Sequence, residues 1–189
     1  MIDLKHKIYL IIFIFFIPLI AFNQENSTYS IKILGVVQDG GLPHLGSDRI
    51  CCEDFEQDRY VTSIMLIANE TNESYLFDAS PDINKQLNFM GKGIKKNLKG
   101  IFLTHAHIGH YTGLMYFGRE ALNSKLMNVY AMPRMKKFLE QNGPWSQLVS
   151  LQNISITELN NNSMIEIDSG VVIQPIEVPH RAEFSETVG

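Results

Sequence analysis

Three of the chain's six histidines, His105, His107 and His110, lie within six residues of one another. They follow an apolar run at 101–103, which we predict to be a buried strand. Imidazole is the commonest neutral metal ligand, and a His-x-His pair on extended chain directs both rings to the same side. The alternative, three unrelated surface histidines, leaves both their density and the preceding strand unexplained. The stretch therefore predicts a metal site beyond the end of a buried strand.

Strand-forming and helix-forming segments alternate on either side of these histidines. Ser80 and Pro81 indicate the start of one helix, because Ser is a favoured N-cap and Pro suits the first helical turn. The order of the elements favours a layered α/β (α+β) fold with a mixed sheet over a doubly wound parallel sheet. The other predicted strands are 31–37, 62–68, 74–77, 128–131, 154–159, 164–167 and 171–178, and the predicted helices are 81–90, 112–123 and 133–142.

Length and composition indicate one globular domain with a sizeable core. The chain has 189 residues, of which 45% are hydrophobic and 19% charged, and its formal net charge is −4. No basic face is evident, so nucleic acid is not an expected partner. A small-molecule substrate fits this composition better.

The N-terminus has the pattern of a secretory signal peptide. Lys5 and Lys7 precede an almost unbroken apolar stretch at 8–22, with a cleavage point expected at 21–24. We therefore assign 1–22 to a signal peptide, 23–30 to a polar linker and 31–189 to the domain. The alternative is a retained membrane anchor, but the apolar stretch is short for a span. No Cys follows it, so a lipid anchor is not expected either. The pattern predicts an exported protein, periplasmic or secreted, without a stable membrane anchor.

The spacing His105-x-His107-x-x-His110 resembles the signature of the metallo-β-lactamase superfamily, whose usual form is His-x-His-x-Asp-His. Asp78 at a strand end, a helix after the histidines and His180 at the end of a later strand follow in the expected order. The resemblance covers 31–189 and implies an αββα sandwich. Within the superfamily, residues 34–43, 111–114 and 180–189 are similar to coenzyme PQQ synthesis protein B and its relatives.

This resemblance implies a role for each matching residue. His105, His107 and His180 match the ligands of the first metal site, where three imidazoles and a water make a tetrahedral Zn²⁺ site. Such an ion activates its water for attack at neutral pH. Asp78 matches an acid close to that site, and we expect it to orient a ligand. The alternative for Asp78 is an ordinary aspartate that ends a strand and begins a turn.

The chain departs from the superfamily pattern at Gly109, where the motif has Asp. His110 matches a ligand of a second metal, but that ion also needs a bridging carboxylate and a His from beyond the third ligand. The sequence stops nine residues after His180, so we expect a C-terminally truncated fold. It would contain the N-terminal half of the sandwich and the start of the second half. One Zn²⁺ is the predicted cofactor, with Fe²⁺ as the alternative. His110 is then a catalytic acid, base or hydrogen-bond donor, or a remaining metal ligand.

The predicted function is an exported metal-dependent hydrolase that acts on an ester, phosphodiester or similar small molecule. One alternative is a protein of PQQ-type cofactor biosynthesis, with iron-dependent oxygen chemistry on a modified peptide precursor. Another is an inactive fragment. The fold alone does not decide among them.

Cys51 and Cys52 are the chain's only cysteines. Adjacent cysteines rarely bond each other because the geometry is strained, so no disulfide framework is expected. Two thiols are too few for a closed zinc site, which would have to be completed by His44, Glu53 or Asp54. The alternative is two unpaired loop thiols.

Overall fold

The computed structural model describes residues 28–49, 59–168, 170–181 and 183–189. The predicted signal peptide, most of the predicted linker and the pair Cys51 and Cys52 lie outside the described residues. Among the residues that are described, no helix is both long enough and apolar enough to span a bilayer.

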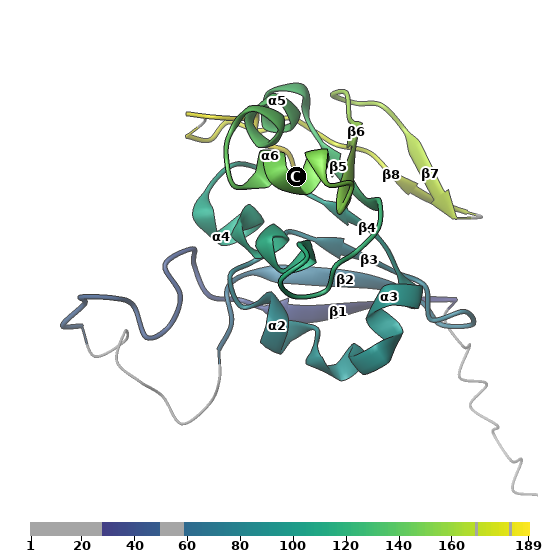
Figure 1. Cartoon of the computed structure of the whole chain (residues 1–189), viewed down its shortest axis with the longest axis horizontal. Helices are drawn as coiled ribbons and strands as arrows, with labels where there is room; N and C mark the ends of the chain where they lie inside the picture. Colours follow the sequence, from purple (N-terminus) through teal and green to yellow (C-terminus); the bar gives the residue numbers. More distant parts are fainter. Residues whose placement is uncertain (1–27, 50–58, 169, 182) are drawn as a thin grey trace, which may run out of the picture.

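A six-stranded mixed sheet forms the centre of the molecule, in the order β1-β2-β3-β4-β5-β6 (Figure 1). β1, β2 and β3 are antiparallel neighbours, whereas β3, β4, β5 and β6 run parallel to one another. The predicted layered α/β class with a mixed sheet is therefore confirmed. The strands are β1 (Tyr29–Gly35), β2 (Ser63–Ala68), β3 (Ser74–Phe77), β4 (Leu98–Phe102), β5 (Met127–Ala131) and β6 (Ile154–Glu158).

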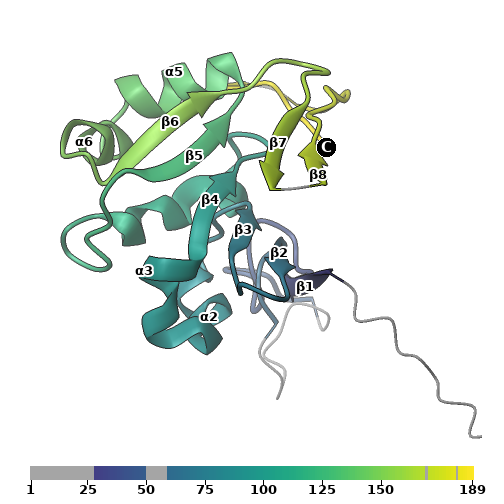
Figure 2. The same ribbon diagram turned by 90° about the vertical axis from the view of Figure 1, so that its right-hand side faces the viewer.

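Helices cover one face of this sheet and a two-stranded hairpin covers part of the other (Figure 2). The hairpin consists of β7 (Ile165–Asp168) and β8 (Val171–Ile173). The helices are α2 (Ile83–Gln86), η2 (Asn88–Gly93), α3 (Ile94–Asn97), α4 (Ile108–Tyr111), η3 (Thr112–Phe117), α5 (Pro133–Gln141) and α6 (Trp145–Ser150).

Two of the three predicted helices are shorter and more broken than the sequence indicated. The predicted helix 81–90 is divided into α2 and the start of the 3₁₀ segment η2, which meet at Leu87 (φ −99°, ψ 2°). The predicted helix 112–123 starts earlier, at Ile108, and its 3₁₀ part ends at Phe117, before an extended Gly118. Helix α6 was not predicted. β8 ends at Ile173 and not at 178, since Pro175 cannot donate a ladder hydrogen bond.

The two faces of the sheet carry separate hydrophobic cores. The larger core lies under the helices and includes Met65, Leu76, Ile101 and Phe117. On the other face, Phe102 lies between Phe77 and Tyr130, with ring centroids 5.2 and 4.2 Å apart. Met132, Leu159 and Val188 are buried in the same cluster, against the hairpin. This aromatic stack lies directly before the histidine stretch and makes the end of β4 rigid.

The β1 end of that second face is open in the described part of the chain. Ile31 and Ile33 of β1 are 68% and 67% exposed. They pair with Leu66 and Ile64 of β2, so an apolar strip continues across both strands. The β7–β8 hairpin packs over the middle of the sheet and leaves this strip uncovered.

Candidate metal centre

The structure brings together the four histidines that the sequence singled out. The ring of His105 lies 4.4 Å from that of His107, 4.1 Å from that of His110 and 5.0 Å from that of His180, measured between centroids. Thr104 to His107 run beyond the end of β4, and His107 is the extended N-cap of α4 (φ −93°, ψ 146°). The predicted geometry, in which an extended His-x-His pair follows a buried strand, is what the structure contains. In Figure 1 the site lies between α4, the loop after β1 and the C-terminal segment.

Three ring nitrogens converge in this cluster. Nδ1 of His107 lies 2.9 Å from Nε2 of His105 and 3.4 Å from Nε2 of His180. One ligand atom from each of the three residues lies within 4.8 Å of the other two. With Zn–N bonds of about 2.0–2.1 Å, two ligands of a tetrahedral ion are about 3.3 Å apart. The three histidines therefore fit one divalent cation.

A hydrogen-bond relay orients His105. Its Nδ1 lies 2.9 Å from Oγ1 of Thr104, and that hydroxyl lies 3.0 and 2.9 Å from the two carboxylate oxygens of Asp78. A carboxylate only accepts, so the hydroxyl donates to Asp78 and accepts from Nδ1–H of His105. This leaves the lone pair of Nε2 free and directed at the other rings, as metal binding requires.

The surroundings also keep His105 neutral. Burial, together with the neighbouring His110, His107 and His180, lowers the pKa of His105 to about 4, against an opposing effect of Asp39. A neutral imidazole is the form that binds a metal ion. No proton has to leave His105 near pH 7 before an ion can bind.

Asp78 connects the end of β3 to two of the site residues. It is buried, its backbone is in the left-handed region (φ 66°), and its N–H donates to the carbonyl of Phe102 at 2.8 Å. One carboxylate oxygen accepts the N–H of Thr104 at 2.8 Å, and the other lies 2.7 Å from Nδ1 of His110. Asp78 thus contacts both Thr104 and His110, and its role in orienting a metal ligand stays a prediction.

Asp39, on the loop after β1, is the site residue that the sequence analysis missed. Its Oδ1 lies 2.9 Å from Nε2 of His110, and its Oδ2 lies 3.6 Å from Nδ1 of His107. Asp39, His105 and His110 form a second group of converging ligand atoms. The one signal in the sequence was its place in the Gln-Asp-Gly-Gly turn, which is part of the segment similar to PQQ synthesis protein B.

Two carboxylates act on His110 from opposite sides. Burial by itself lowers the pKa of His110, but the hydrogen bond to Asp78 and the negative charges of Asp78 and Asp39 outweigh burial and raise it. In the metal-free protein His110 therefore holds a proton more strongly than an ordinary histidine. Nδ1 of His110 faces Asp78, and its Nε2 faces Asp39, which lines the cavity.

Close backbone contacts hold His110 in this place. The carbonyl of His110 accepts the N–H of Ala79 at 2.8 Å, and the N–H of Gly113 donates to the carbonyl of Ala79 at 2.9 Å. A Cβ at position 113 would lie 2.1 Å from the carbonyl oxygen of Ser80. Only glycine allows the loop after β3 to pack so closely against η3.

The C-terminal segment supports the histidine stretch from the other side. The hydroxyl of Ser185 accepts the N–H of Ala106 at 2.8 Å, and the N–H of Val188 donates to the carbonyl of Thr104 at 3.1 Å. Both Ser185 and Val188 are buried. This segment therefore contributes His180, a candidate metal ligand, and the packing that positions the other histidines.

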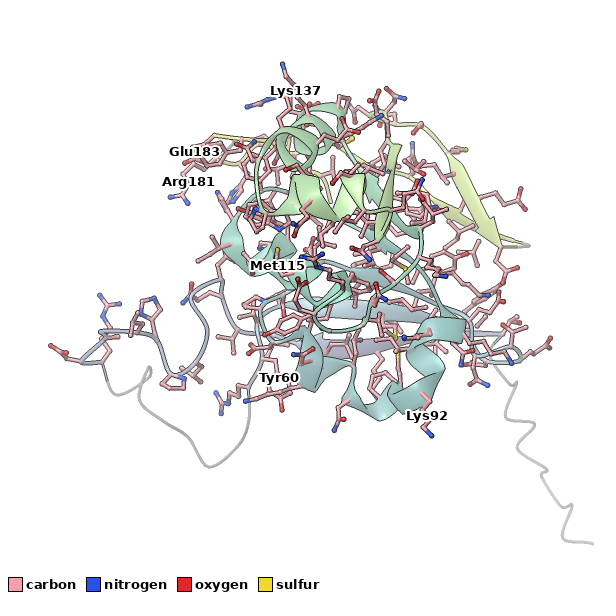
Figure 3. All side chains as sticks on the ribbon, viewed as in Figure 1. Tyr60, Lys92, Met115, Lys137, Arg181 and Glu183 are labelled. Atoms are coloured by element: carbon pink, nitrogen blue, oxygen red, sulfur yellow. The ribbon has the colours of Figure 1, made fainter. Side chains whose placement is uncertain are left out.

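The histidines open into a cavity of about 510 Å³ that Gln38 and Arg181 also line. Nη2 of Arg181 lies 3.3 Å from Nε2 of His107, and Nε of Arg181 forms an ion pair of 2.8 Å with Glu183. Figure 3 shows Arg181 and Glu183 together at the edge of the molecule. The cavity thus combines converging imidazoles with an exposed guanidinium.

A layered fold with a mixed sheet and a histidine cluster beyond its parallel strands defines a class of metal-binding proteins, the metallo-β-lactamase superfamily. A family model described as the β-lactamase superfamily domain matches residues 73–189. The match covers more than half of the chain, and the chain belongs to this family. No curated protein matches the chain.

Solved structures of the same fold agree with this assignment. A diphosphatase from the PhnP family is 23% identical with a TM-score of 0.63, over 85% of this chain and 60% of that one. The Zn²⁺-bound PqqB from Methylobacterium extorquens is 19% identical with a TM-score of 0.66, over 85% and 57%. The short form of human tRNase Z is 18% identical with a TM-score of 0.53, over 84% and 61%. The chain thus spans about three fifths of the length of each, which agrees with the prediction of a partial sandwich.

Proposed function

We propose that this chain carries the metal site of a metal-dependent hydrolase whose substrate is a phosphodiester or a related phosphate ester. The convergence of His105 Nε2, His107 Nδ1 and His180 Nε2 is the observation that carries the proposal. A divalent ion held by three imidazoles lowers the pKa of a coordinated water to near 7, which makes hydroxide available for attack at neutral pH.

The protein's own groups have defined tasks in such a reaction. His105, His107 and His180 hold the ion, and the relay through Thr104 to Asp78 keeps the first of these rings in the tautomer that binds metal. His110 lies between Asp78 and Asp39, which raise its pKa, and its ring lines the cavity, where it can exchange a proton with a bound substrate. Both features support hydrolysis over simple metal storage.

Arg181 favours an anionic substrate. Its guanidinium lines the cavity beside His107 and is paired only with the exposed carboxylate of Glu183 among the contacts described. A guanidinium matches the oxygens of a phosphate group in charge and geometry. Among the solved structures with this fold, one is described as a diphosphatase and another as a tRNase Z. These descriptions agree with phosphate ester chemistry.

The proposed ion is Zn²⁺, although imidazole ligands also suit Fe²⁺. Metal analysis of protein purified without added metal separates the two. Stoichiometric zinc is the expected result. Iron together with oxygen consumption would contradict the hydrolase proposal and support cofactor biosynthesis.

The decisive experiment measures hydrolysis of bis(p-nitrophenyl) phosphate by the metal-loaded chain. We expect activity to be lost after chelation, to return with Zn²⁺, and to be absent in His105→Ala. His44→Ala is the matched control, because His44 is an exposed histidine on the loop after β1. Full activity in His105→Ala, or after complete metal removal, would rule the proposal out.

Export is a separate proposal that rests on the basic and apolar pattern of residues 5–22. The measurement is the mass of the recovered protein, which identifies its first residue, after expression in a secretion-competent host. A mature chain that begins near residue 22–24 is the expected result, and an intact N-terminus on the recovered protein contradicts it.

A further inference from the structure

We propose that Glu186 is a positioning residue of the three-histidine site, because it fastens the C-terminal segment next to His180 to the N-terminus of α5. This inference deepens the proposed function, since it rests on the metal site of that proposal. Glu186 is not among the residues that line the cavity. The affinity of the site for its ion should therefore depend on a contact that none of the three histidines makes.

The carboxylate of Glu186 caps α5 from a distant part of the chain. The N-cap residue Met132 forms no side-chain cap hydrogen bond. Both carboxylate oxygens of Glu186 instead accept the backbone N–H of Arg134, at 3.2 and 3.1 Å and across 52 positions of the chain. The first N–H groups of a helix have no partner within the helix, and a negative charge there also complements the helix dipole. Figure 1 shows the yellow C-terminal segment beside α5.

Ser185, which precedes Glu186, fastens the same segment to the His-x-His stretch. Its buried hydroxyl accepts the N–H of Ala106 at 2.8 Å and donates to the carbonyl of Glu186 at 2.7 Å. Ala106 is the residue between His105 and His107. The segment therefore links the start of α5 to the middle of the pair that supplies two of the three candidate ligands.

The chain on either side of His180 is paired with itself. The N–H of Val178 donates to the carbonyl of Thr187 at 3.0 Å, and residues 177 and 188 form an isolated bridge. His180 follows one of these paired flanks by two positions, and Glu186 directly precedes the other. A contact that fixes Glu186 on α5 therefore restricts the backbone that carries His180.

His180 needs such support because its own ring has little. The relay through Thr104 orients His105, which is buried. His180 is exposed, and the contact described for its ring nitrogen is the one with Nδ1 of His107, at 3.4 Å. A ligand that is fixed before binding loses less conformational freedom when the ion binds. The orientation of His180 thus depends on the backbone of its segment.

The experiment measures the Zn²⁺ affinity of the chelator-treated full chain by competition with a chromophoric chelator. We expect Glu186→Ala to weaken binding by ~10-fold, the lower end of the cost of losing an outer partner of a metal ligand. Glu186→Gln should bind as the unchanged protein does, because its amide oxygen still accepts the N–H of Arg134. This pair of variants separates the hydrogen bond from the negative charge.

A double-mutant cycle shows whether Glu186 acts through His180. The affinity of His180→Ala is measured with a weaker competing chelator, because one candidate ligand is missing. Adding Glu186→Ala to it should change the affinity by less than about twofold, since the ring that Glu186 positions is absent. A further loss of ~10-fold in this background would show that Glu186 acts independently of His180 and would overturn the inference.

Glu140→Ala is the matched control. Glu140 is an exposed glutamate near the other end of α5, so its removal changes the charge of the same helix without touching the C-terminal segment's cap. It should keep the affinity of the unchanged protein. A thermal melt of each metal-free variant checks folding. If Glu186→Ala fails to fold, Glu186→Asp carries the test, because it keeps the charge and shortens the reach to Arg134.

Unchanged affinity in Glu186→Ala overturns the inference, and so does an equal loss in Glu186→Gln. The readout does not depend on hydrolysis. The expected losses of affinity without hydrolysis by any form contradict the proposed function alone, whereas hydrolysis with an affinity independent of Glu186 contradicts only this inference. A chain that binds no Zn²⁺ contradicts both.

Discussion

The Nδ1 atom of His110 lies 2.7 Å from Oδ2 of Asp78, a residue that follows β3. The other oxygen of the same carboxylate accepts the N–H of Thr104 at 2.8 Å. Asp78 therefore connects Thr104, which directly precedes the first histidine, with His110, the last of the three histidines. Because the carboxylate is buried, its effect on His110 is weakly screened by solvent and should be measurable.

The first prediction concerns this contact. Asp78→Asn should lower the pKa of His110 in the metal-free chain, because it removes the hydrogen-bonded negative charge that helps to raise that pKa. Asn also tolerates the left-handed backbone at position 78 (φ 66°). NMR titration of the imidazole resonances is the measurement, with Asp48→Asn as the control. An unchanged pKa of His110 in Asp78→Asn would show that the contact is absent in solution.

The second prediction is a pH dependence of stability that comes from His105. Its pKa falls from 6.5 to about 4 on folding. Between these values the unfolded His105 binds a proton that the folded His105 does not, so its contribution to the stability of the metal-free protein decreases as the pH falls through this window. His110 has a raised pKa and acts oppositely, since its contribution is present below 6.5 and is lost as the pH rises through its folded value.

A comparison of variants isolates the effect of His105. Urea denaturation with chelator at pH 7 and pH 5 should show a smaller loss of stability at pH 5 for His105→Asn than for the unchanged protein. His44→Asn, at an exposed position, should retain the full loss. Equal losses in His105→Asn and the unchanged protein contradict the prediction.

The third prediction concerns Gly113. An added Cβ would lie 2.1 Å from the carbonyl oxygen of Ser80 and 2.8 Å from that of Ala79. Gly113→Ala should therefore destabilise the chain by about 1–3 kcal/mol, the usual cost of forcing atoms into a packed interior. It should also weaken the contact between Asp78 and His110, because the same loop carries Asp78. The measurement is the free energy of unfolding by urea.

Gly93→Ala is the matched control for Gly113→Ala. Its Cβ meets only the flexible side chain of Asn97, so its effect on the free energy of unfolding should be small. If both variants unfold at the same urea concentration, the close packing of η3 on the loop after β3 is not a stabilising feature.

The sequence predicted the histidine cluster because its signal is local. His105 and His107 are separated by one residue on extended chain after a buried strand, and this pattern alone directs both rings to one side. Asp39 gave no comparable signal. It contacts His110 across 71 positions of the chain, and its approach depends on the space left at Gly109. No periodicity in the sequence indicates which turn carboxylate enters a site formed elsewhere.

The helices were harder to predict than the strands for a related reason. The predicted helix 81–90 satisfied the rules for its start, with Ser80 and Pro81, but its α-helical part is only Ile83–Gln86, and the chain continues after Leu87 as a 3₁₀ segment. The strands β4 and β5 were found because Ile101 and Phe102 in β4, and Val129 to Ala131 in β5, are apolar residues that contact the layers on both sides of the sheet. Tertiary contacts thus determine where these helices begin and end, whereas the pattern of apolar residues in the sequence is enough to locate the strands.

The last prediction tests the part of the proposed function that concerns the substrate. Arg181→Ala should raise KM for a phosphodiester several-fold with a smaller effect on kcat, because an exposed guanidinium binds the substrate's charge without entering the reaction. It should leave hydrolysis of an uncharged ester unchanged. Arg119→Ala is the matched control, since Arg119 is also an exposed arginine whose Nε lies 3.0 Å from a neighbouring glutamate, Glu120, and it does not line the cavity. Equal loss toward charged and uncharged substrates would mean that Arg181 acts by supporting His107, from which it lies 3.3 Å, and not by binding the anion.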